Sequence, residues 1–474
     1  MSAFYISAAH KSSGKTTLSI GLVRAFANRG MRIQPFKKGP DYIDPIWHAQ
    51  ASGNPCYNLD FHTQTRDEIL DTYARHMQGV RLGLVEGNKG LFDGMDVEGS
   101  NSNAAMAKLL GVPVILVINC QGMTRGIAPL LLGYQAFDPE IDFAGVILNR
   151  VGGSRHEAKL IEVVEHYTDI PVMGCVHQDS RLQIEERHLG LIPGNEEASA
   201  ETLIRRLATR VEEQVDLDRM LDLADRASAP ATPVQEQISD SPGPVYSGLR
   251  IGLARDRAFG FYYPDDLERF QALGVELVEF DTLNDQQLPD VDGIFIGGGF
   301  PETAMEALQD NSAMRQSVAE FIEKGGPVYA ECGGLMYLTR TLTWNGKQCR
   351  MAGVIPGDTV MHDKPKGRGY VRLRDTGRSP WPRLQTQGEA MIAAHEFHYS
   401  SLEGLETATD DFAYEVVRGY GIDGRYDGFI YKNLLASYTH LRSVGGNDWV
   451  KRFVAQVAAE KNDQAASKVQ VNDV

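Results

Sequence analysis

The amino-acid sequence predicts an α/β protein with two doubly wound domains, each built on a sheet that helices cover on both faces. Apolar runs of strand length, such as those at 112–118 and 143–150, alternate with helical patterns from the N-terminus onward. A second alternating series begins near residue 249, after a segment rich in Pro, Ser, Ala and Gln. The 474 residues also exceed what one typical core contains.

These patterns set the expected domain boundaries. We predict a first domain over 1–225, a linker over 226–248, a second domain over 249–458 and a disordered tail over 459–474. The second domain becomes richer in strands from about residue 350, and the chain shows no internal repeat.

Composition and charge narrow the classes of protein. Hydrophobic residues make up 42% and charged residues 23%, which is ordinary for a soluble globular protein. The longest apolar runs fall short of the roughly 20 residues of a membrane span, and no signal peptide is visible at the N-terminus. The net charge of −16 argues against nucleic-acid binding, although a locally basic pocket is compatible with a small anionic substrate.

The cysteines indicate a reducing environment. They show neither the paired spacing of a metal site nor a disulfide framework. A cytoplasmic protein with reduced thiols is therefore expected. The cysteines occupy positions 56, 120, 175, 332 and 349.

The first expected strand, helix and intervening loop carry a nucleotide-binding pattern. "AAHKSSGKTT" at 8–17 matches the GK[ST] end of a phosphate loop, although Ala9 stands where such loops have a first glycine. Backbone N–H groups of such a loop surround phosphate, while Lys15 contacts the outer phosphates and Thr16 faces magnesium. A chance match is the alternative, but the position between a strand and a helix favours nucleotide binding. The predicted nucleotide-binding residues here are Ser13, Gly14, Lys15, Thr16 and Thr17.

Two later strand ends add polar candidates. Glu86 ends the strand "LGLVEG", where such folds hold a magnesium-coordinating carboxylate. Asn149 ends the strand at 143–150 and is a candidate for hydrogen bonding to a purine edge. For Asn149 a simple strand-end turn is an equally weighted alternative.

The loop "FKKGPDYIDP" at 36–45 concentrates charge next to the phosphate loop. Asp41 and Asp44 are candidates for binding a second metal or orienting a substrate carboxylate, and Lys37 and Lys38 for meeting anionic groups. The alternative is a capped turn with a solvated charge cluster. The position of this loop next to the predicted nucleotide site favours a functional role.

In the second domain, "PVYAECGGLMYL" at 327–338 has the features of a nucleophile elbow: a strand, a sharp turn with small neighbours, and a helix. The helix N-terminus after Cys332 favours its thiolate. The alternative is a small buried hydrophobic residue. His440, in "LLASYTHLR", is the expected partner for thiol acyl transfer.

The glycine-rich strand end "IFIGGGFPE" at 294–302 is a candidate oxyanion hole. The residues predicted for it are Gly298, Gly299 and Gly333. The position two residues after the histidine, a place for a triad carboxylate, holds Arg442, so a third triad member is not assigned. Glu396 is a candidate for orienting His440; alternatively, His395 and Glu396 are purely structural.

Several segments together resemble the a,c-diamide synthases of tetrapyrrole metabolism. They are "QPFKKGPDYIDPIWHA", "NLD" at 58–60, "EGNKGLFDG" at 86–94 and "ERHLGL" at 186–191. The second domain resembles a class I glutamine amidotransferase domain of the cobyrinate type, and "HEFHYS" at 395–400 belongs to this likeness. The resemblance implies an N-terminal P-loop NTPase-like synthetase domain and a C-terminal glutamine amidotransferase domain. It covers nearly the whole chain outside the linker and tail.

The resemblance also implies roles for individual residues. Asp41, Asp44, Glu86 and Asp93 would belong to the synthetase site with Lys15 and Thr16. Tyr42 and Ile43 fall where the family contacts its macrocycle. The expected metal ligands are Thr16, Asp41 and Glu86, and the expected substrate-binding residues are Lys37, Asp41, Tyr42, Ile43, Asp44 and Asp93. His48, His188 and His398 lie in family-like segments and are interpreted as structural.

The two domains suggest one reaction. Cys332 would attack the side-chain amide of glutamine, with His440 supporting proton transfer. The first domain would use ATP and Mg2+ to phosphorylate substrate carboxylates, which ammonia then converts to amides. The resemblance implies a tetrapyrrole amidated at its a and c acetates, with cobyrinic acid as the leading candidate and sirohydrochlorin or sirohaem as alternatives. The competing prediction is a non-catalytic P-loop switch ATPase with a degenerate amidase domain. A homodimer is a candidate assembly.

Overall fold

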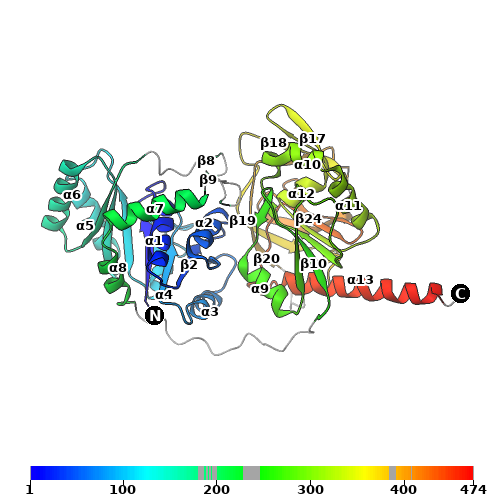
Figure 1. Cartoon of the computed structure of the whole chain (residues 1–474), viewed down its shortest axis with the longest axis horizontal. Coiled ribbons are helices and arrows are strands. Elements are labelled where there is room, and N and C mark those ends of the chain that lie inside the picture. The colour runs from blue at the N-terminus through cyan, green and yellow to red at the C-terminus, as the bar shows by residue number, and fades with distance from the viewer. Residues whose placement is uncertain are drawn as a thin grey trace. The chain divides into compact units, whose positions relative to one another are not determined.

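The computed structural model describes residues 2–179, 186–187, 190–191, 194, 200–227, 246–383, 391–406 and 408–472. The chain divides into two compact units, Met1–Gln237 and Ile238–Val474 (Figure 1). The division falls inside the predicted linker at 226–248, of which 228–245 lies outside the described residues. Each unit is an α/β structure, as the alternating strand and helix patterns predicted.

The first unit is built on a seven-stranded sheet in the order β3-β2-β4-β1-β5-β6-β7. Neighbouring strands are parallel throughout this sheet. The carboxyl ends of the strands therefore meet at one edge, where the loops that carry the candidate residues lie. The strands are β1 (Ala3–Ala8), β2 (Ile33–Lys38), β3 (Tyr57–Leu59), β4 (Leu82–Glu86), β5 (Val114–Asn119), β6 (Phe143–Val151) and β7 (Val172–His177).

Helices cover both faces of this sheet, because successive side chains of each strand point to opposite sides. Along β1, Phe4, Ile6 and Ala8 pack into one hydrophobic cluster, while Ala3 and Tyr5 pack into the other. The helices are α1 (Lys15–Asn28), α2 (Ile43–Ser52), α3 (Arg66–His76), α4 (Asn103–Leu110), α5 (Ile127–Phe137), α6 (Ser154–Tyr167), α7 (Ala200–Gln214) and α8 (Leu217–Ala224). The short strands β8 (Glu186–Arg187) and β9 (Gly190–Leu191) form a separate pair.

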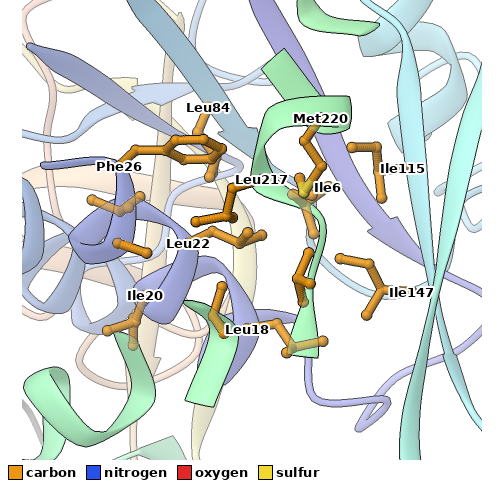
Figure 2. Packing of buried hydrophobic residues seen from close by; sticks show 14 of the residues in the cluster. Ile6, Leu18, Ile20, Leu22, Phe26, Leu84, Ile115, Ile147, Leu217 and Met220 are labelled. Atoms are coloured by element: carbon orange, nitrogen blue, oxygen red, sulfur yellow. The ribbon is translucent and has the colours of Figure 1, made fainter. Parts of the chain in front are cut away.

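The first cluster fixes α1 against the sheet. Figure 2 shows Leu22 and Phe26 of α1 packed among side chains of the central strands and of α8. A fully buried Leu, Ile or Phe stabilises the fold by about 1.5–3 kcal/mol relative to exposure. This packing holds the start of α1, and with it the phosphate loop, at the carboxyl edge of the sheet.

The second unit has a nine-stranded sheet in the order β12-β10-β13-β15-β24-β23-β22-β19-β20. The pairs from β12 to β24 are parallel and the remaining pairs are antiparallel. The strands are β10 (Arg250–Ala254), β12 (Glu276–Phe280), β13 (Gly293–Ile296), β15 (Val328–Glu331), β19 (Gly367–Asp375), β20 (Met391–His398), β22 (Phe412–Arg418), β23 (Tyr426–Tyr431) and β24 (Leu434–Ser437).

Smaller elements complete this unit. A four-stranded sheet contains β16 (Thr339–Trp344), β17 (Lys347–Arg350), β18 (Ile355–Met361) and β21 (Ser400–Glu403), and β11 (Phe259–Phe261) pairs with β14 (Gly298–Gly299). The helices are α9 (Pro264–Ala272), α10 (Met305–Asp310), α11 (Ser312–Glu323), α12 (Gly333–Leu338) and α13 (Trp449–Asn472), with 3-10 turns at Pro301–Ala304 and Thr409–Asp411.

The C-terminal segment differs from the prediction. Helix α13 continues to Asn472, so the expectation of a disordered tail over 459–474 is wrong for the described residues of that segment. Ala, Glu, Lys and Gln are frequent beyond residue 458, and these residues have high helix propensity. Lys461 also ties the helix to the unit, since its Nζ donates to the Gly248 carbonyl and to Asp292, each at 2.8 Å. No helix within the described ranges combines the length and apolar character needed to cross a bilayer.

Candidate active sites

A sharp turn lies at Cys332, between β15 and α12. Its φ of 48° and ψ of −101° are a strained conformation for a residue with a side chain. The surroundings enforce it: the Cys332 N–H donates to the Ser437 carbonyl at 2.7 Å, and its carbonyl accepts from Met336 N–H at 3.0 Å. Gly334 permits the close turn, because a Cβ there would lie 2.2 Å from the Ile296 carbonyl oxygen. The predicted elbow is present.

His440 reaches Cys332 through strand pairing. β15 and β24 are parallel neighbours with Glu331 opposite Ser437, and His440 follows β24 by three positions. The imidazole is 3% exposed and hydrogen-bonds Cys332. Its backbone N–H donates to the His395 carbonyl at 2.8 Å. The structure therefore brings the two predicted catalytic side chains together in a buried setting.

A carboxylate that the sequence analysis did not select contacts the other side of this pair. Glu331 Oε2 lies 3.2 Å from His440 Nδ1. Its Oε1 accepts from the Tyr329 hydroxyl at 2.5 Å and from Leu441 N–H at 2.9 Å. The only sequence signal was its position directly before the predicted nucleophile.

Glu396, the carboxylate proposed to orient His440, has other partners. It accepts from the N–H groups of Tyr420 at 2.7 Å and Gly421 at 2.8 Å. The structural alternative for Glu396 fits these contacts, and it is Glu331 that lies against the imidazole. His398 is also structural, since its Nδ1 contacts the Ser400 carbonyl at 2.9 Å and its ring stacks on Tyr438.

The environment of His440 favours its charged form. Burial by itself lowers the pKa of His440, but the hydrogen bonds with Cys332 and Glu331 outweigh it and raise the pKa to about 10. A cationic imidazole beside a cysteine favours a thiolate–imidazolium pair, which is the reactive form in thiol acyl transfer.

The three glycines predicted for the oxyanion hole lie close to this pair. A Cβ on Gly298 would lie 2.5 Å from His440 Cε1, and one on Gly333 would lie 3.0 Å from Gly299 N. Only residues without side chains fit at these positions. The backbone therefore approaches the Cys332–His440 pair closely, and main-chain N–H groups are the donors that oxyanion holes use.

Arg442 has a structural role in place of the missing downstream carboxylate. The guanidinium is 1% exposed, and its Nε and Nη2 each donate to Asp265 Oδ2 at 2.8 Å. It also lies 5.0 Å from the centre of the Tyr263 ring. These contacts anchor the end of the His440 segment to the start of α9.

In the first unit, the phosphate loop lies between β1 and α1 as predicted. Ser12 and Gly14 have φ values of 63° and 87°, which turn backbone groups inward. Asn149 Nδ2 donates to the Ser13 carbonyl at 2.8 Å, so the end of β6 supports the loop directly. Thr17 is partly exposed in the first turn of α1. The purine role of Asn149 stays a prediction.

Lys15 is buried at the centre of this loop. Its Nζ donates to the Lys89 carbonyl at 2.8 Å. Burial and the nearby Lys37 ammonium lower the pKa of Lys15 to about 8, against the opposing effect of Glu86. Lys15 forms no ion pair with the residues that the structure describes, so an anionic phosphate at this position would supply a charge partner.

Glu86 is the centre of a buried polar network beside Lys15. Its Oε1 accepts from Thr16 Oγ1 at 2.7 Å and from Lys37 Nζ at 2.9 Å, and its Oε2 contacts His48 Nε2 at 2.5 Å. Asp44 joins the network through Thr16 Oγ1 at 3.2 Å and an ion pair with Lys37. Burial by itself raises the pKa of Glu86, but Lys37 and His48 outweigh it and hold it well below its usual range.

The partner of His48 is what sequence reasoning missed. His48 was expected to be a hydrogen-bonded structural residue, and its fully buried ring does form such a contact, with the central carboxylate of the network. Asp44 and His48 are four positions apart on α2, which places them on one face of the helix. That spacing was the available signal.

The remaining loop residues lie around this network. Asp41 Oδ1 accepts from Ile43 N–H at 2.8 Å, while its Oδ2 lies 4.0 Å from Lys37 Nζ. Lys38 Nζ donates to Asn88 Oδ1 at 3.2 Å, and burial lowers the pKa of Lys38 to about 8. Tyr42 is buried and Ile43 partly exposed at the start of α2. Asp93 is exposed and accepts from Gly90 N–H at 2.9 Å within its own loop. His188 lies outside the described residues.

The network fits a magnesium ion through its oxygen atoms. The described residues contain no group of three or more His, Cys, Asp or Glu arranged to hold a metal. A mixed set exists instead: Thr16 Oγ1 lies 2.7 Å from Glu86 Oε1 and 3.2 Å from Asp44 Oδ2. Adjacent ligands of an octahedral Mg2+ are about 2.9 Å apart, given Mg–O distances near 2.1 Å. The Lys37 ammonium pairs with the same two carboxylates, Glu86 and Asp44, and offsets their negative charge.

Comparisons with known proteins agree with the two domains. Residues 6–192 match the CobQ/CobB/MinD/ParA nucleotide binding domain, and residues 250–447 match the CobB/CobQ-like glutamine amidotransferase domain. A cobyrinate a,c-diamide synthase of Magnetococcus marinus is 45% identical over 459 residues, covering 96% of this chain and 97% of that protein. Proteins of the same name from Archaeoglobus fulgidus and Methanosarcina acetivorans are each 39% identical, covering 94% and 93% of this chain and 96% and 92% of their own lengths. The chain belongs to the cobyrinate a,c-diamide synthase family.

Proposed function

We propose that this chain uses ATP and glutamine to amidate the a and c acetate carboxylates of cobyrinate. The observation that carries the proposal is the presence in one chain of a Cys332–His440 pair on a strained elbow and a phosphate loop beside buried carboxylates. The first supplies ammonia and the second activates an acceptor carboxylate. The names of the relatives supply the acceptor.

The second unit would release ammonia from glutamine. Cys332 Sγ attacks the side-chain amide carbon, and the backbone N–H groups of Gly298, Gly299 and Gly333 stabilise the oxyanion. His440 transfers its proton to the departing nitrogen as the C–N bond breaks. Water, deprotonated by the neutral imidazole, then hydrolyses the thioester and releases glutamate.

The first unit would activate the acceptor. The N–H groups of Ser13 to Thr17 and the Lys15 ammonium bind the phosphates of ATP, and Asn149 supports the loop and reaches the base. The acceptor carboxylate attacks the γ-phosphorus, which gives an acyl phosphate and ADP. Ammonia then attacks the acyl carbon, phosphate leaves, and the amide forms.

Thr16, Glu86 and Asp44 would hold Mg2+, with Asp41 as a further ligand from the same loop. When bound, the ion supplies charge neutralisation on the transferring phosphoryl group. Lys37 is the protein's own cation among these carboxylates.

The loop at 36–45 and the neighbouring Asp93 would bind the substrate. Tyr42 and Ile43 offer apolar surface for a macrocycle, and Lys37 offers a positive charge for a carboxylate. Asp41, Asp44 and Asp93 complete the proposed substrate-binding set. Asn58 fixes the loop, since its Nδ2 donates to the carbonyls of Gly39 at 2.7 Å and Asp41 at 2.8 Å.

Mass spectrometry tests the proposal directly. The chain is incubated with ATP, Mg2+ and glutamine, and with cobyrinic acid, sirohydrochlorin or sirohaem in separate reactions. Cobyrinic acid is expected to lose the mass difference between OH and NH2 at two carboxylates. No mass change with any of the three would overturn the proposal, and amidation of sirohaem alone would reassign the acceptor.

A further inference from the structure

We propose that Glu331 is the positioning carboxylate for His440, so that the residue before the nucleophile completes the amidotransferase site. This inference rests on the proposed glutamine-hydrolysing function of the second unit. The role of Glu331 is to hold the His440 imidazole in one orientation and tautomer while Cys332 acts on glutamine. Glu331 would touch neither glutamine nor the reacting atoms.

The hydrogen bonds of Glu331 fix it on both sides. Oε1 accepts from the Tyr329 hydroxyl at 2.5 Å and from Leu441 N–H at 2.9 Å, which leaves Oε2 directed at His440 Nδ1 at 3.2 Å. Glu331 and His440 are 2% and 3% exposed, so water does not compete for these bonds. A buried carboxylate held in this way restricts the rotation of the imidazole.

The topology explains why the carboxylate comes from this position. β15 and β24 run parallel, with Glu331 opposite Ser437, so the chain beyond β24 passes the end of β15. The elbow then turns the backbone so that the adjacent residues Glu331 and Cys332 both hydrogen-bond one imidazole. A carboxylate two residues after the histidine is unnecessary, and Arg442 occupies that position.

Other carboxylates near His440 have other partners. Asp265 pairs with Arg442, and the buried Asp266 accepts from Ser443 N–H at 2.7 Å. The buried Asp427 accepts from the N–H groups of Tyr438 and Thr439, each at 3.0 Å, and from the Thr439 hydroxyl. Asp427 therefore shapes the backbone before His440. Among the described residues, Glu331 is the carboxylate in contact with the imidazole Nδ1.

The electrostatic setting agrees with this geometry. The titratable groups that face His440 are Cys332 from the elbow, Glu331 from β15 and His395 from β20, whose ring centre is 6.4 Å away. Tyr329 and Asp266 lie around Glu331 itself. Loss of the Glu331 charge would remove one of the two contacts that keep the imidazole protonated.

The test compares three variants of the full chain. Glu331→Gln removes the charge at similar size, and Glu331→Asp keeps the charge but withdraws it by one methylene. Glu396→Gln is the matched control, because Glu396 is also a buried carboxylate of this unit. It accepts from the N–H groups of Tyr420 and Gly421, and its Oε2 lies 3.7 Å from His398 Nε2. Glutamine hydrolysis gives kcat and KM, and NMR of labelled histidines gives the titration of His440.

We expect Glu331→Gln to lower kcat by about tenfold or more, as part of the roughly 10²–10⁴-fold that general acid–base catalysis contributes in total, with KM nearly unchanged. The His440 titration should move to lower pH. Glu331→Asp should recover part of kcat, and Glu396→Gln should leave both kcat and the titration at wild-type values.

A Glu331→Gln variant that keeps kcat within about twofold of wild type would overturn the positioning role. So would a His440 titration that does not differ from that of Glu396→Gln. Amidation supported by added ammonia reports the first unit separately. A wild-type chain that hydrolyses no glutamine would instead overturn the proposed function, while the His440 titration would still decide the role of Glu331.

Discussion

At the scale of single residues, the most buried side chains of the two candidate sites form hydrogen-bonded networks. Cys332, His440 and Glu331 are all at most 7% exposed, and Lys37, Glu86 and His48 are at most 3% exposed. Charges at this depth are stable only when paired, so each network restricts its members to few arrangements. The two networks are built from different residues, so a substitution in one should leave the activity that depends on the other unchanged.

Replacing Cys332 with Ala tests this independence. Glutamine-dependent amidation should disappear, because no thiolate remains to attack the amide. Activity with added ammonia should persist near the wild-type level, since Lys15, Thr16 and Glu86 are untouched. Product formation from each nitrogen source is the measurement. Loss of ammonia-dependent activity would contradict the two-site scheme.

Replacing His48 with Gln tests the other network. Glu86 would lose its contact with a ring nitrogen, so its carboxylate would be less firmly oriented. Removing the partner of a ligand commonly costs 10–100-fold, and we expect about that loss in ammonia-dependent amidation. Glutamine hydrolysis should be unchanged. His166→Gln, on the exposed side of α6, is the control and should alter neither activity.

At the scale of elements, each site lies where a parallel strand ends and a helix begins. β1 with α1 and β15 with α12 repeat one arrangement, a strand followed by a turn with a positive φ and a glycine. Each glycine has its own reason: Gly14 has a φ of 87°, which disfavours residues with side chains, and a Cβ on Gly334 would lie 2.2 Å from a backbone oxygen. The elbow at Cys332 is therefore intolerant of even one methyl group.

Gly334→Ala should destabilise the second unit and abolish glutamine hydrolysis, because Ile296 is fixed in β13 and cannot move away. We expect a loss of about 1–3 kcal/mol in unfolding free energy, the usual cost of overpacking. Gly133→Ala is the contrast, since a Cβ there meets nothing within 4 Å and Gly133 lies inside α5. It should gain up to about 1 kcal/mol. Thermal and urea unfolding measure both changes.

At the scale of the whole molecule, the sequence predicted what depends on local pattern. The alternating strands, the phosphate loop and the elbow were all legible because each occupies a few consecutive residues. The partners of Glu331 and His48 were missed because they are distant in the sequence: Glu331 meets His440 across 109 positions, and His48 meets Glu86 across 38. Periodicity indicates that a strand exists, but not which strand lies beside it. The tail was mispredicted because its residues of high helix propensity, such as Ala, Lys and Gln, allow the preceding helix to continue.

ATP binding by the first unit and glutamine hydrolysis by the second should also depend differently on pH. The pKa of Lys15 is lowered to about 8, whereas that of His440 is raised to about 10. Lys15 carries its charge below its pKa and loses it as the pH rises through about 8, so affinity for ATP should fall there. His440 keeps its proton over the same interval, so glutamine hydrolysis should persist until the pH approaches about 10.

Equilibrium binding of a fluorescent ATP analogue and release of glutamate, both followed from neutral pH upward, measure the two responses. Binding is preferred to ammonia-dependent turnover, because the fraction of free ammonia itself rises with pH. Lys15→Arg is the control, since a guanidinium stays charged throughout this range and its binding curve should be flat. Parallel decline of binding in wild type and Lys15→Arg would show that another group governs the nucleotide site. A persistent difference between them would assign the decline to the Lys15 ammonium, because burial lowers the pKa of Lys15 to about 8.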